Sequence, residues 1–280
     1  FGIGTETLGS IVSPSTRNGV TGLRPTYGRV SRYGAMALSW SMDKIGSMCR
    51  SVEDCALVFD AIHGPDDQDA TLVDLPFNWD AQRDISKLRI GYYKSAFEAK
   101  RENNVVWKKN DDASLALLQD MGLNLIPIEL PDEIDLRSIR FVLGVEAAAA
   151  FDELTRNNRD DLLVRQNKGA WPNTFRKARM IPAVEYIQAN RVRTLVMQQM
   201  AEVMEQIDVF VTPSYGGNNL LLTNLTGHPA VCLPNGFKES GSPTSISFVG
   251  QLYGEADMLA VARVYQEATD FHLQHPVLER

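Results

Sequence analysis

Residues 2–23, GIGTETLGSIVSPSTRNGVTGL, contain glycine, serine and threonine at high density. Glycine permits sharp turns, in which consecutive backbone N–H groups can point the same way and stabilise negative charge developing on an oxygen. Ser10, between Gly9 and the apolar Ile11, would be presented there as a nucleophile. The alternative is a glycine-rich turn between two strands, whose hydroxyls cap backbone groups. The stretch by itself is compatible with both interpretations.

Other uses of glycine-rich loops do not fit this chain. It has no phosphate-loop GK[ST], no GxGxxG ahead of a helix and no GxSxG nucleophile elbow. Its four histidines are scattered without metal-ligand spacing, so we expect no metal and no cofactor. The three cysteines, Cys49, Cys55 and Cys232, lie in apolar surroundings and are predicted to be small buried residues rather than a disulfide framework.

The composition is that of a mildly acidic globular chain. With 280 residues, 44% of them apolar, it can bury a large core, and its net charge of −7 offers no basic surface to nucleic acid. No apolar run approaches the roughly 20 residues that cross a bilayer. We therefore expect neither a nucleic-acid nor a membrane partner, and a cytoplasmic location. Phe1 stands within an apolar, glycine-rich run, which indicates a longer protein cut at this point.

Hydrophobic periodicity predicts an α/β protein. Ser51 is the predicted N-cap of a helix over 51–63. Residues 87–93, 105–121 and 123–130 form a strand–helix–strand unit of the kind that builds a parallel sheet. The remaining predicted elements are a helix-rich segment over 137–207, irregular at 166–182, strands over 208–214, 227–237 and 244–253, and a helix over 255–271.

The longest informative segment is residues 4–71, GTETLGSIVSPSTRNGVTGLRPTYGRVSRYGAMALSWSMDKIGSMCRSVEDCALVFDAIHGPDDQDAT. It resembles the amidase signature family, above all the peptide amidase-like and malonamidase-like members with a GTET-x-GSI core. Residues 208–214, 224–237 and 245–269 are also similar to that family. The resemblance implies the amidase signature fold, a mixed and mostly parallel sheet flanked by helices. Residues 1–280 would be the C-terminal portion of one such domain, with a variable, helix-rich segment at about 131–205.

The resemblance also implies roles for individual residues. Ser10 matches the nucleophile, which attacks an amide carbonyl and forms an acyl-enzyme. The backbone N–H groups of four residues match the oxyanion hole, namely Thr7, Leu8, Gly9 and Ser10. Thr5 matches a threonine whose hydroxyl supports the catalytic network. The implied activity is hydrolysis of a linear amide C–N bond, with a small amide as substrate.

Two positions depart from the family pattern. Leu8 stands where glycine or aspartate is usual, which puts the width of the pocket in doubt but keeps the N–H. Val12 stands where many relatives carry an arginine that pairs with the acidic residue matched by Glu6. Glu6 therefore needs another partner, and Arg17, Arg24 or backbone N–H groups are the candidates. We predict a structural role for Glu6.

The family's base is missing from this chain. In the family a neutral lysine takes the serine proton through a second serine held by a cis peptide bond, and both residues precede the nucleophile. Neither is present here, and Lys44, beside Asp43, is predicted to form a surface or structural ion pair. A serine without its base is a poor nucleophile. We therefore expect the chain alone to be nearly inactive, to need the missing N-terminal part, and to expose apolar surface that favours association, including homo-oligomers.

Four residues near the motif have a structural and a binding interpretation. Trp40 and Met36 are predicted to pack in the core rather than to line an acyl pocket. Arg29 and Tyr33 lie in a segment that is near the substrate entrance in relatives, and a structural role is favoured for both.

Two other functions remain open. One is the glutamine-hydrolysing subunit of a tRNA-dependent amidotransferase, which usually has SDTGGSIRQP where this chain has TETLGSIVSP. The other is a non-catalytic scaffold that kept the fold. An upstream lysine and GGSSGGS loop would favour the hydrolase, and a missing lysine the scaffold.

Overall fold

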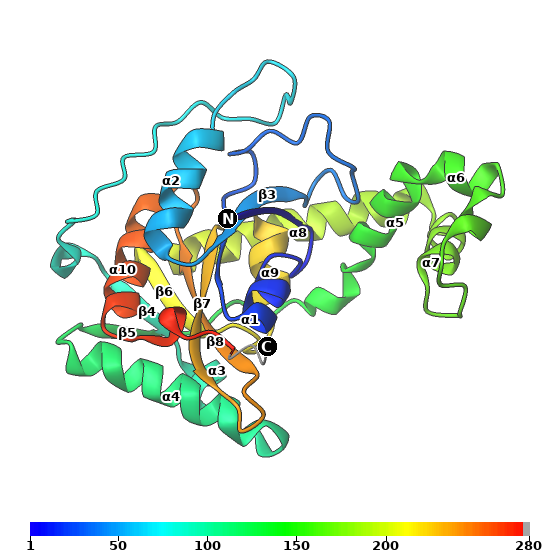
Figure 1. The fold of residues 1–280 in the computed structure, drawn as a ribbon. Helices are drawn as coiled ribbons and strands as arrows, with labels where there is room; N and C mark the ends of the chain where they lie inside the picture. Colours follow the sequence, from blue (N-terminus) through cyan, green and yellow to red (C-terminus); the bar gives the residue numbers. More distant parts are fainter. Residues whose placement is uncertain (277–280) are drawn as a thin grey trace.

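The computed structural model describes residues 1–276. Within them, one eight-stranded sheet organises the fold, with the strand order β1-β3-β2-β7-β8-β6-β4-β5 (Figure 1). The strands are β1 (Gly2–Glu6), β2 (Thr21–Arg24), β3 (Lys44–Cys49), β4 (Ile90–Tyr93), β5 (Leu125–Ile128), β6 (Val209–Pro213), β7 (Ala230–Phe237) and β8 (Pro243–Gly250).

Most neighbouring strands run antiparallel. Five of the seven pairs are antiparallel, and only β4 pairs in parallel, with β5 and with β6. The predicted strand–helix–strand unit is therefore real, and the α/β class is confirmed. The expected majority of parallel pairs is wrong. One reason is the loop 238–242 between β7 and β8, which is too short for the crossover that parallel pairing requires.

Helices cover both faces of this sheet (Figure 1). Among residues 1–276 they are α1 (Val12–Asn18), α2 (Val52–Ile62), α3 (Lys94–Glu98), α4 (Val105–Asp120), α5 (Phe141–Ala150), α6 (Asp152–Arg156), α7 (Trp171–Ala178), α8 (Ala183–Met204), α9 (Asn219–Thr226) and α10 (Glu255–Glu267). None of these helices has the length and the apolar character that crossing a membrane requires.

The alternation of side chains along β6 shows how the two faces are filled. Val209 and Val211 are fully buried in a cluster with residues of α2, α4 and α10. Phe210, between them, is buried in a second cluster with residues of α8 and α9. Successive side chains of a strand point to opposite faces, so both faces of the sheet are packed against helices.

The start of α2 is as predicted. Ser51 Oγ accepts a hydrogen bond from the backbone N–H of Asp54 at 3.0 Å, and the Asp54 carboxylate accepts one from the Ser51 N–H at 3.2 Å. This reciprocal capping box satisfies two N–H groups that a helix start leaves unpaired.

Residues 131–205 contain helices and no strand. Helices α5, α6 and α7 extend to one side of the molecule, and the long α8 leads back from them to the sheet (Figure 1). We call α5 to α8 the helical arm. A small apolar cluster of Ala147, Ala148, Phe175 and Ala178 holds α5 against α7, and Leu38 of the loop before β3 packs on it. The arm therefore contacts the N-terminal third of the chain.

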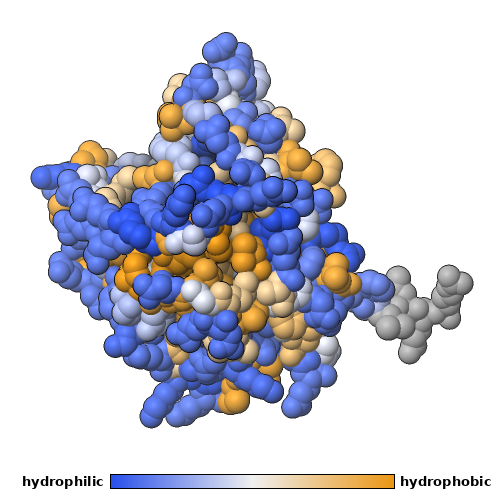
Figure 2. Space-filling model, turned by 90° about the vertical axis from the view of Figure 1, so that its left-hand side faces the viewer, coloured by the Kyte–Doolittle hydropathy of each residue, from blue (hydrophilic) through white to orange (hydrophobic). Residues whose placement is uncertain are grey.

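The long segment between α2 and β4 has little regular structure but still covers the core. Its Phe77, Trp79 and Ile85 side chains pack on the cluster formed with α2 and α10. Figure 2 shows one face of the molecule, on which hydrophobic surface gathers in the middle and hydrophilic residues surround it.

Candidate active site

The quoted stretch forms a tight turn between β1 and α1. Gly9 has φ +87°, a backbone conformation that L side chains rarely adopt, and a Cβ there would lie 3.0 Å from Leu220 Cδ2. The next residue, Ser10, is exposed. The glycine therefore serves both the turn and the close approach of α9, and the serine hydroxyl is left accessible.

The buried Glu6 carboxylate holds this turn by hydrogen bonds to its backbone. Its Oε2 accepts hydrogen bonds from the backbone N–H groups of Ile11 and Val12 at 2.8 and 3.0 Å. Its Oε1 accepts one from Arg24 Nη1 at 2.7 Å and one from Asn224 Nδ2 at 2.8 Å. Burial alone would raise the pKa of Glu6, but these partners outweigh it and lower the pKa to about 2. The predicted structural role is confirmed, with Arg24 and the backbone as the partners.

The backbone of the turn leaves donors unused. Within residues 1–276, the N–H groups of Leu8, Gly9 and Ser10 donate no hydrogen bond to another protein atom. The Thr7 hydroxyl is engaged, because it donates to Asp43 Oδ1 at 2.5 Å. Unpaired N–H groups beside an accessible hydroxyl are suited to hold an oxyanion.

A cavity of about 400 Å³ opens at this turn. Thr5, Thr7 and Ser10 form one side of it, and ten residues between 32 and 45 together with residues 68–71 form the others. The walls combine charged groups with apolar side chains, so the cavity can hold a ligand with both an amide and an apolar portion.

The apolar wall differs from what the sequence indicated. Trp40 and Met36 line the cavity and are 48% and 83% exposed, so the prediction that they pack in the core is wrong. Tyr33 also lines the cavity and is exposed. Arg29 does not line it, because its buried guanidinium donates to the backbone oxygens of Leu75 and Pro76. The apolar character of a loop residue does not determine whether its side chain packs in the core or lines a cavity.

Lys44 is buried rather than exposed. It is 2% exposed, lies opposite Glu6 in the β1–β3 register, and donates from Nζ to the Met42 oxygen. Within the described residues it forms no salt bridge, so the predicted ion pair with Asp43 is wrong. Burial, reinforced by the Arg24 guanidinium, lowers the pKa of Lys44 well below its ordinary value. Lys44 nevertheless lines the cavity at Ser10.

An ion pair between Arg32 and Asp69 lines the cavity, and no sequence pattern indicated it. Arg32 Nε donates to Asp69 Oδ2 at 2.9 Å, and Arg32 Nη2 donates to Oδ1 at 3.2 Å. The Arg32 guanidinium also stacks over the Tyr27 ring at 4.8 Å. Hydrogen bonds from Arg32 hold the pKa of the Asp69 carboxyl below its usual range. The two residues are 37 positions apart, so no local pattern connects them.

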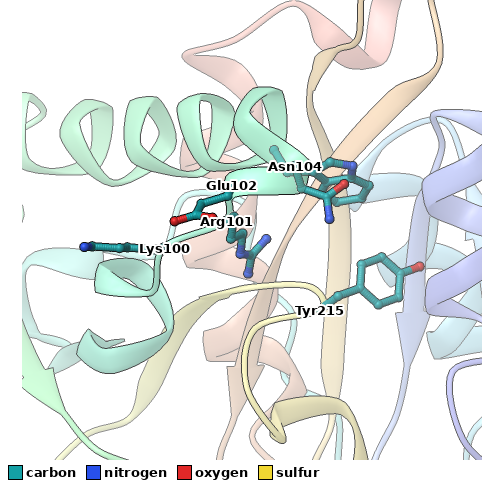
Figure 3. Close-up of a pocket in the computed structure, with 6 residues that line it drawn as sticks. Lys100, Arg101, Glu102, Asn104 and Tyr215 are labelled. Carbon is teal, nitrogen blue, oxygen red and sulfur yellow. The ribbon is translucent and has the colours of Figure 1, made fainter.

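A second cavity, of about 650 Å³, shares no lining residue with the one at Ser10 (Figure 3). Arg101 on its wall is paired with the buried Asp111 at 3.0 Å. Burial, only partly offset by Arg101, raises the pKa of Asp111 to about 7. Within residues 1–276 its lining includes no serine, threonine or cysteine. The part of the chain that the structure describes also contains no group of histidine, cysteine, aspartate and glutamate residues arranged to hold a metal ion.

These features define an α/β protein with an accessible serine on a glycine turn at the edge of its sheet. A profile of the amidase family, described as "Amidase", matches residues 1–220. The chain belongs to this family, and the predicted family is confirmed.

The curated relatives are longer than this chain. The chain is 31% identical to a glutamyl-tRNA(Gln) amidotransferase subunit of Roseiflexus castenholzii and 30% identical to the corresponding subunit of Ralstonia nicotianae. Each match covers 98% of this chain, but only 64% and 66% of the relatives.

Solved structures confirm the amidase signature fold. An amidase family protein from Bacillus anthracis is 26% identical with a TM-score of 0.77, over 96% of this chain and 57% of that one. Peptide amidase from Stenotrophomonas maltophilia is 24% identical with a TM-score of 0.74, over 95% and 61%. A bacterial aryl acylamidase of the amidase signature family is 17% identical with a TM-score of 0.79, over 98% and 64%.

Proposed function

We propose that the complete protein hydrolyses the C–N bond of a linear amide through an acyl-enzyme on Ser10. The supporting observation is the placement of Ser10, which is exposed at the cavity and follows a turn with unused N–H groups. Ser10 Oγ attacks the amide carbon, and the N–H groups of Thr7, Leu8, Gly9 and Ser10 hold the oxyanion. The amine leaves with a proton, and water then releases the acid from the ester.

The proton of Ser10 needs an acceptor, since a serine hydroxyl is weak at its free pKa. We propose a neutral lysine acting through a second serine, both supplied by sequence upstream of residue 1, with Thr5 supporting the network. The curated relatives are longer than this chain, which is compatible with such residues. This chain on its own would then show little or no amide hydrolysis.

The test uses the complete protein and a panel of short aliphatic, aromatic and peptide amides. We expect Ser10→Ala to lower kcat/KM by at least about 10³-fold, since it removes the nucleophile. A fluorophosphonate probe should label the parent at Ser10 and leave this variant unlabelled. Ser13→Ala, one helical turn away, is the matched control and should keep parental rates. Parental turnover by Ser10→Ala would show that another residue is the nucleophile.

A second candidate is the glutamine-hydrolysing subunit of a tRNA-dependent amidotransferase. It is favoured by the names of the relatives at 30–31% identity. Glutamine would then be the substrate, and its hydrolysis would rise strongly when partner subunits and tRNA are added. Hydrolysis of simple amides at full rate by the isolated complete protein favours the first function. A protein that is not labelled at Ser10 and hydrolyses neither substrate would be a scaffold.

A further inference from the structure

A buried carboxylate in the helical arm contacts the loop before β3. Glu146 of α5 is 0% exposed. Its Oε2 accepts hydrogen bonds from Ser39 Oγ at 2.5 Å and from the Ser41 N–H at 3.2 Å. Its Oε1 accepts from Ser41 Oγ at 2.8 Å and from Tyr186 Oη of α8 at 2.8 Å. Both carboxylate oxygens are therefore satisfied by two elements that are far apart in sequence.

The second long helix of the arm holds the same loop. Arg193 of α8 donates from Nη1 to Ser41 Oγ at 2.7 Å and from Nη2 to the Ser41 backbone oxygen at 2.9 Å. Its Nε donates to the Leu225 oxygen of α9 at 2.6 Å. A guanidinium can only donate and a carboxylate can only accept. The Ser41 hydroxyl therefore accepts from Arg193 and donates its single proton to Glu146.

The loop is tied in turn to the nucleophile's turn. Asp43 Oδ2 accepts from the N–H groups of Leu38 and Ser39 at 2.8 and 2.9 Å. Its Oδ1 accepts from Thr7 Oγ1 at 2.5 Å, three residues before Ser10. A continuous set of hydrogen bonds, the Glu146 relay, therefore runs from the arm through residues 38–43 to the turn.

The relay is expensive to bury. A carboxylate taken out of water loses several kcal/mol of hydration, and well-packed apolar residues are often as stable in such a place. What charged and hydroxyl groups add is direction, because their hydrogen bonds specify one orientation of the loop. Displacement of a reacting group by about 1 Å can cost about 10²-fold in rate, so the orientation of this loop matters at Ser10.

We propose that Glu146 is a positioning residue, which orients the turn at Thr7–Ser10 through Ser39, Ser41 and Asp43. Glu146 is not among the residues that line the cavity at Ser10. It acts through the loop, and it makes the reactivity of Ser10 dependent on the packing of the helical arm. The inference rests on the proposed function of Ser10.

The test compares Glu146→Gln and Glu146→Ala in the complete protein. We expect the rate of fluorophosphonate labelling and kcat to fall about 10-fold in Glu146→Gln and about 10²-fold in Glu146→Ala, with KM within about twofold. Glu153→Gln, on the exposed surface of α6, is the matched control and should be unchanged. Should Glu146→Ala fail to fold, Ser41→Ala removes the central hydroxyl alone and should show the same split between kcat and KM.

Hydrogen exchange tests the positioning role of Glu146 separately from the proposed function of Ser10. The hydrogen-bonded backbone amides of Ile11 and Val12 in the turn, and of Leu38, Ser39 and Ser41 in the loop, should exchange faster in Glu146→Gln than in Glu153→Gln. A folded Glu146→Gln with parental labelling and parental exchange overturns the relay. A parent that is not labelled at Ser10 overturns the proposed function, and the exchange of these amides then still decides whether Glu146 holds the turn.

Discussion

The turn at residues 7–11 and the helical arm are held by different physics. The turn depends on local backbone rules and on one buried carboxylate, Glu6, that accepts N–H groups five and six residues away. The arm depends on contacts between distant elements, such as Phe175 stacked on Phe151 and Glu146 bonded to the loop before β3. Short-range contacts therefore shape the turn that carries Ser10, and long-range contacts are proposed to orient this turn. Substitutions in the two regions should accordingly differ in size and in kind.

The largest effect on stability is expected at Glu6. Glu6→Gln leaves the buried Arg24 without its charge partner, and removing one partner of a buried ion pair costs about 3–5 kcal/mol of unfolding free energy. Urea unfolding of the variant and of the exposed control Glu129→Gln measures it. A loss no greater than that of the control would mean that the pair does not anchor the turn.

The loss of unfolding free energy caused by Glu6→Gln should depend on pH. The pKa of Glu6 is about 2 in the folded protein, below its ordinary value of 4.5, so the folded state favours the carboxylate. Its contribution is complete above about pH 4.5 and is lost as pH falls through about 2. The gap in stability between parent and Glu6→Gln should therefore narrow in acid, and a constant gap would contradict the assignment.

An intermediate effect is expected at Gly9. Gly9→Ala forces an L side chain into φ +87° and against Leu220, at a cost of about 1–3 kcal/mol, and should disturb labelling of Ser10. Gly122→Ala is a matched control, because Gly122 has φ +83° with nothing within 4 Å of the added Cβ. It should lose stability through strain alone and keep the labelling rate. Equal labelling rates in Gly9→Ala and Gly122→Ala would show that the backbone conformation at Gly9 does not control the reactivity of Ser10.

The smallest effect is expected inside the arm, away from the relay. Phe175→Leu trims a buried ring that stacks on Phe151 and Trp171, and should cost about 1 kcal/mol in a thermal or urea melt. Because Phe175 makes none of the relay hydrogen bonds, the labelling rate should stay parental. A large loss of labelling would mean that arm packing as a whole, and not Glu146, aims the turn.

Local signals predicted the elements that are held locally. The N-cap at Ser51, the strand–helix–strand unit and the closing helix each carry their own pattern, and all appear in the structure. The strands β1 to β3 and the helices α1 and α9 were not predicted, and α7 lies where irregular structure was expected. A four-residue strand such as β2, fully buried, shows no alternation, so only its neighbours in the sheet reveal it.

The environment of the site was predicted only in part. The sharp turn at Gly9 was predicted from the motif, because glycine adopts a positive φ without steric cost. The motif left open whether the Ser10 hydroxyl is exposed or caps backbone groups, and the structure shows it exposed. The burial of Lys44 and the openness of Trp40 and Met36 run against their residue types. Burial is decided by what packs on a position, and those elements are remote in sequence.

The residues that shape the turn are neighbours in the sequence. Ser10, Gly9 and Glu6, whose carboxylate accepts backbone N–H groups, all lie within residues 6–10. Which arginine pairs with Glu6, which loop forms the cavity wall, and that Glu146 reaches Ser41 across 105 positions became known from the assembled fold. The physical reason is range. Backbone conformation and capping depend on adjacent residues, whereas burial and long hydrogen-bond networks exist only once the sheet and helices have assembled.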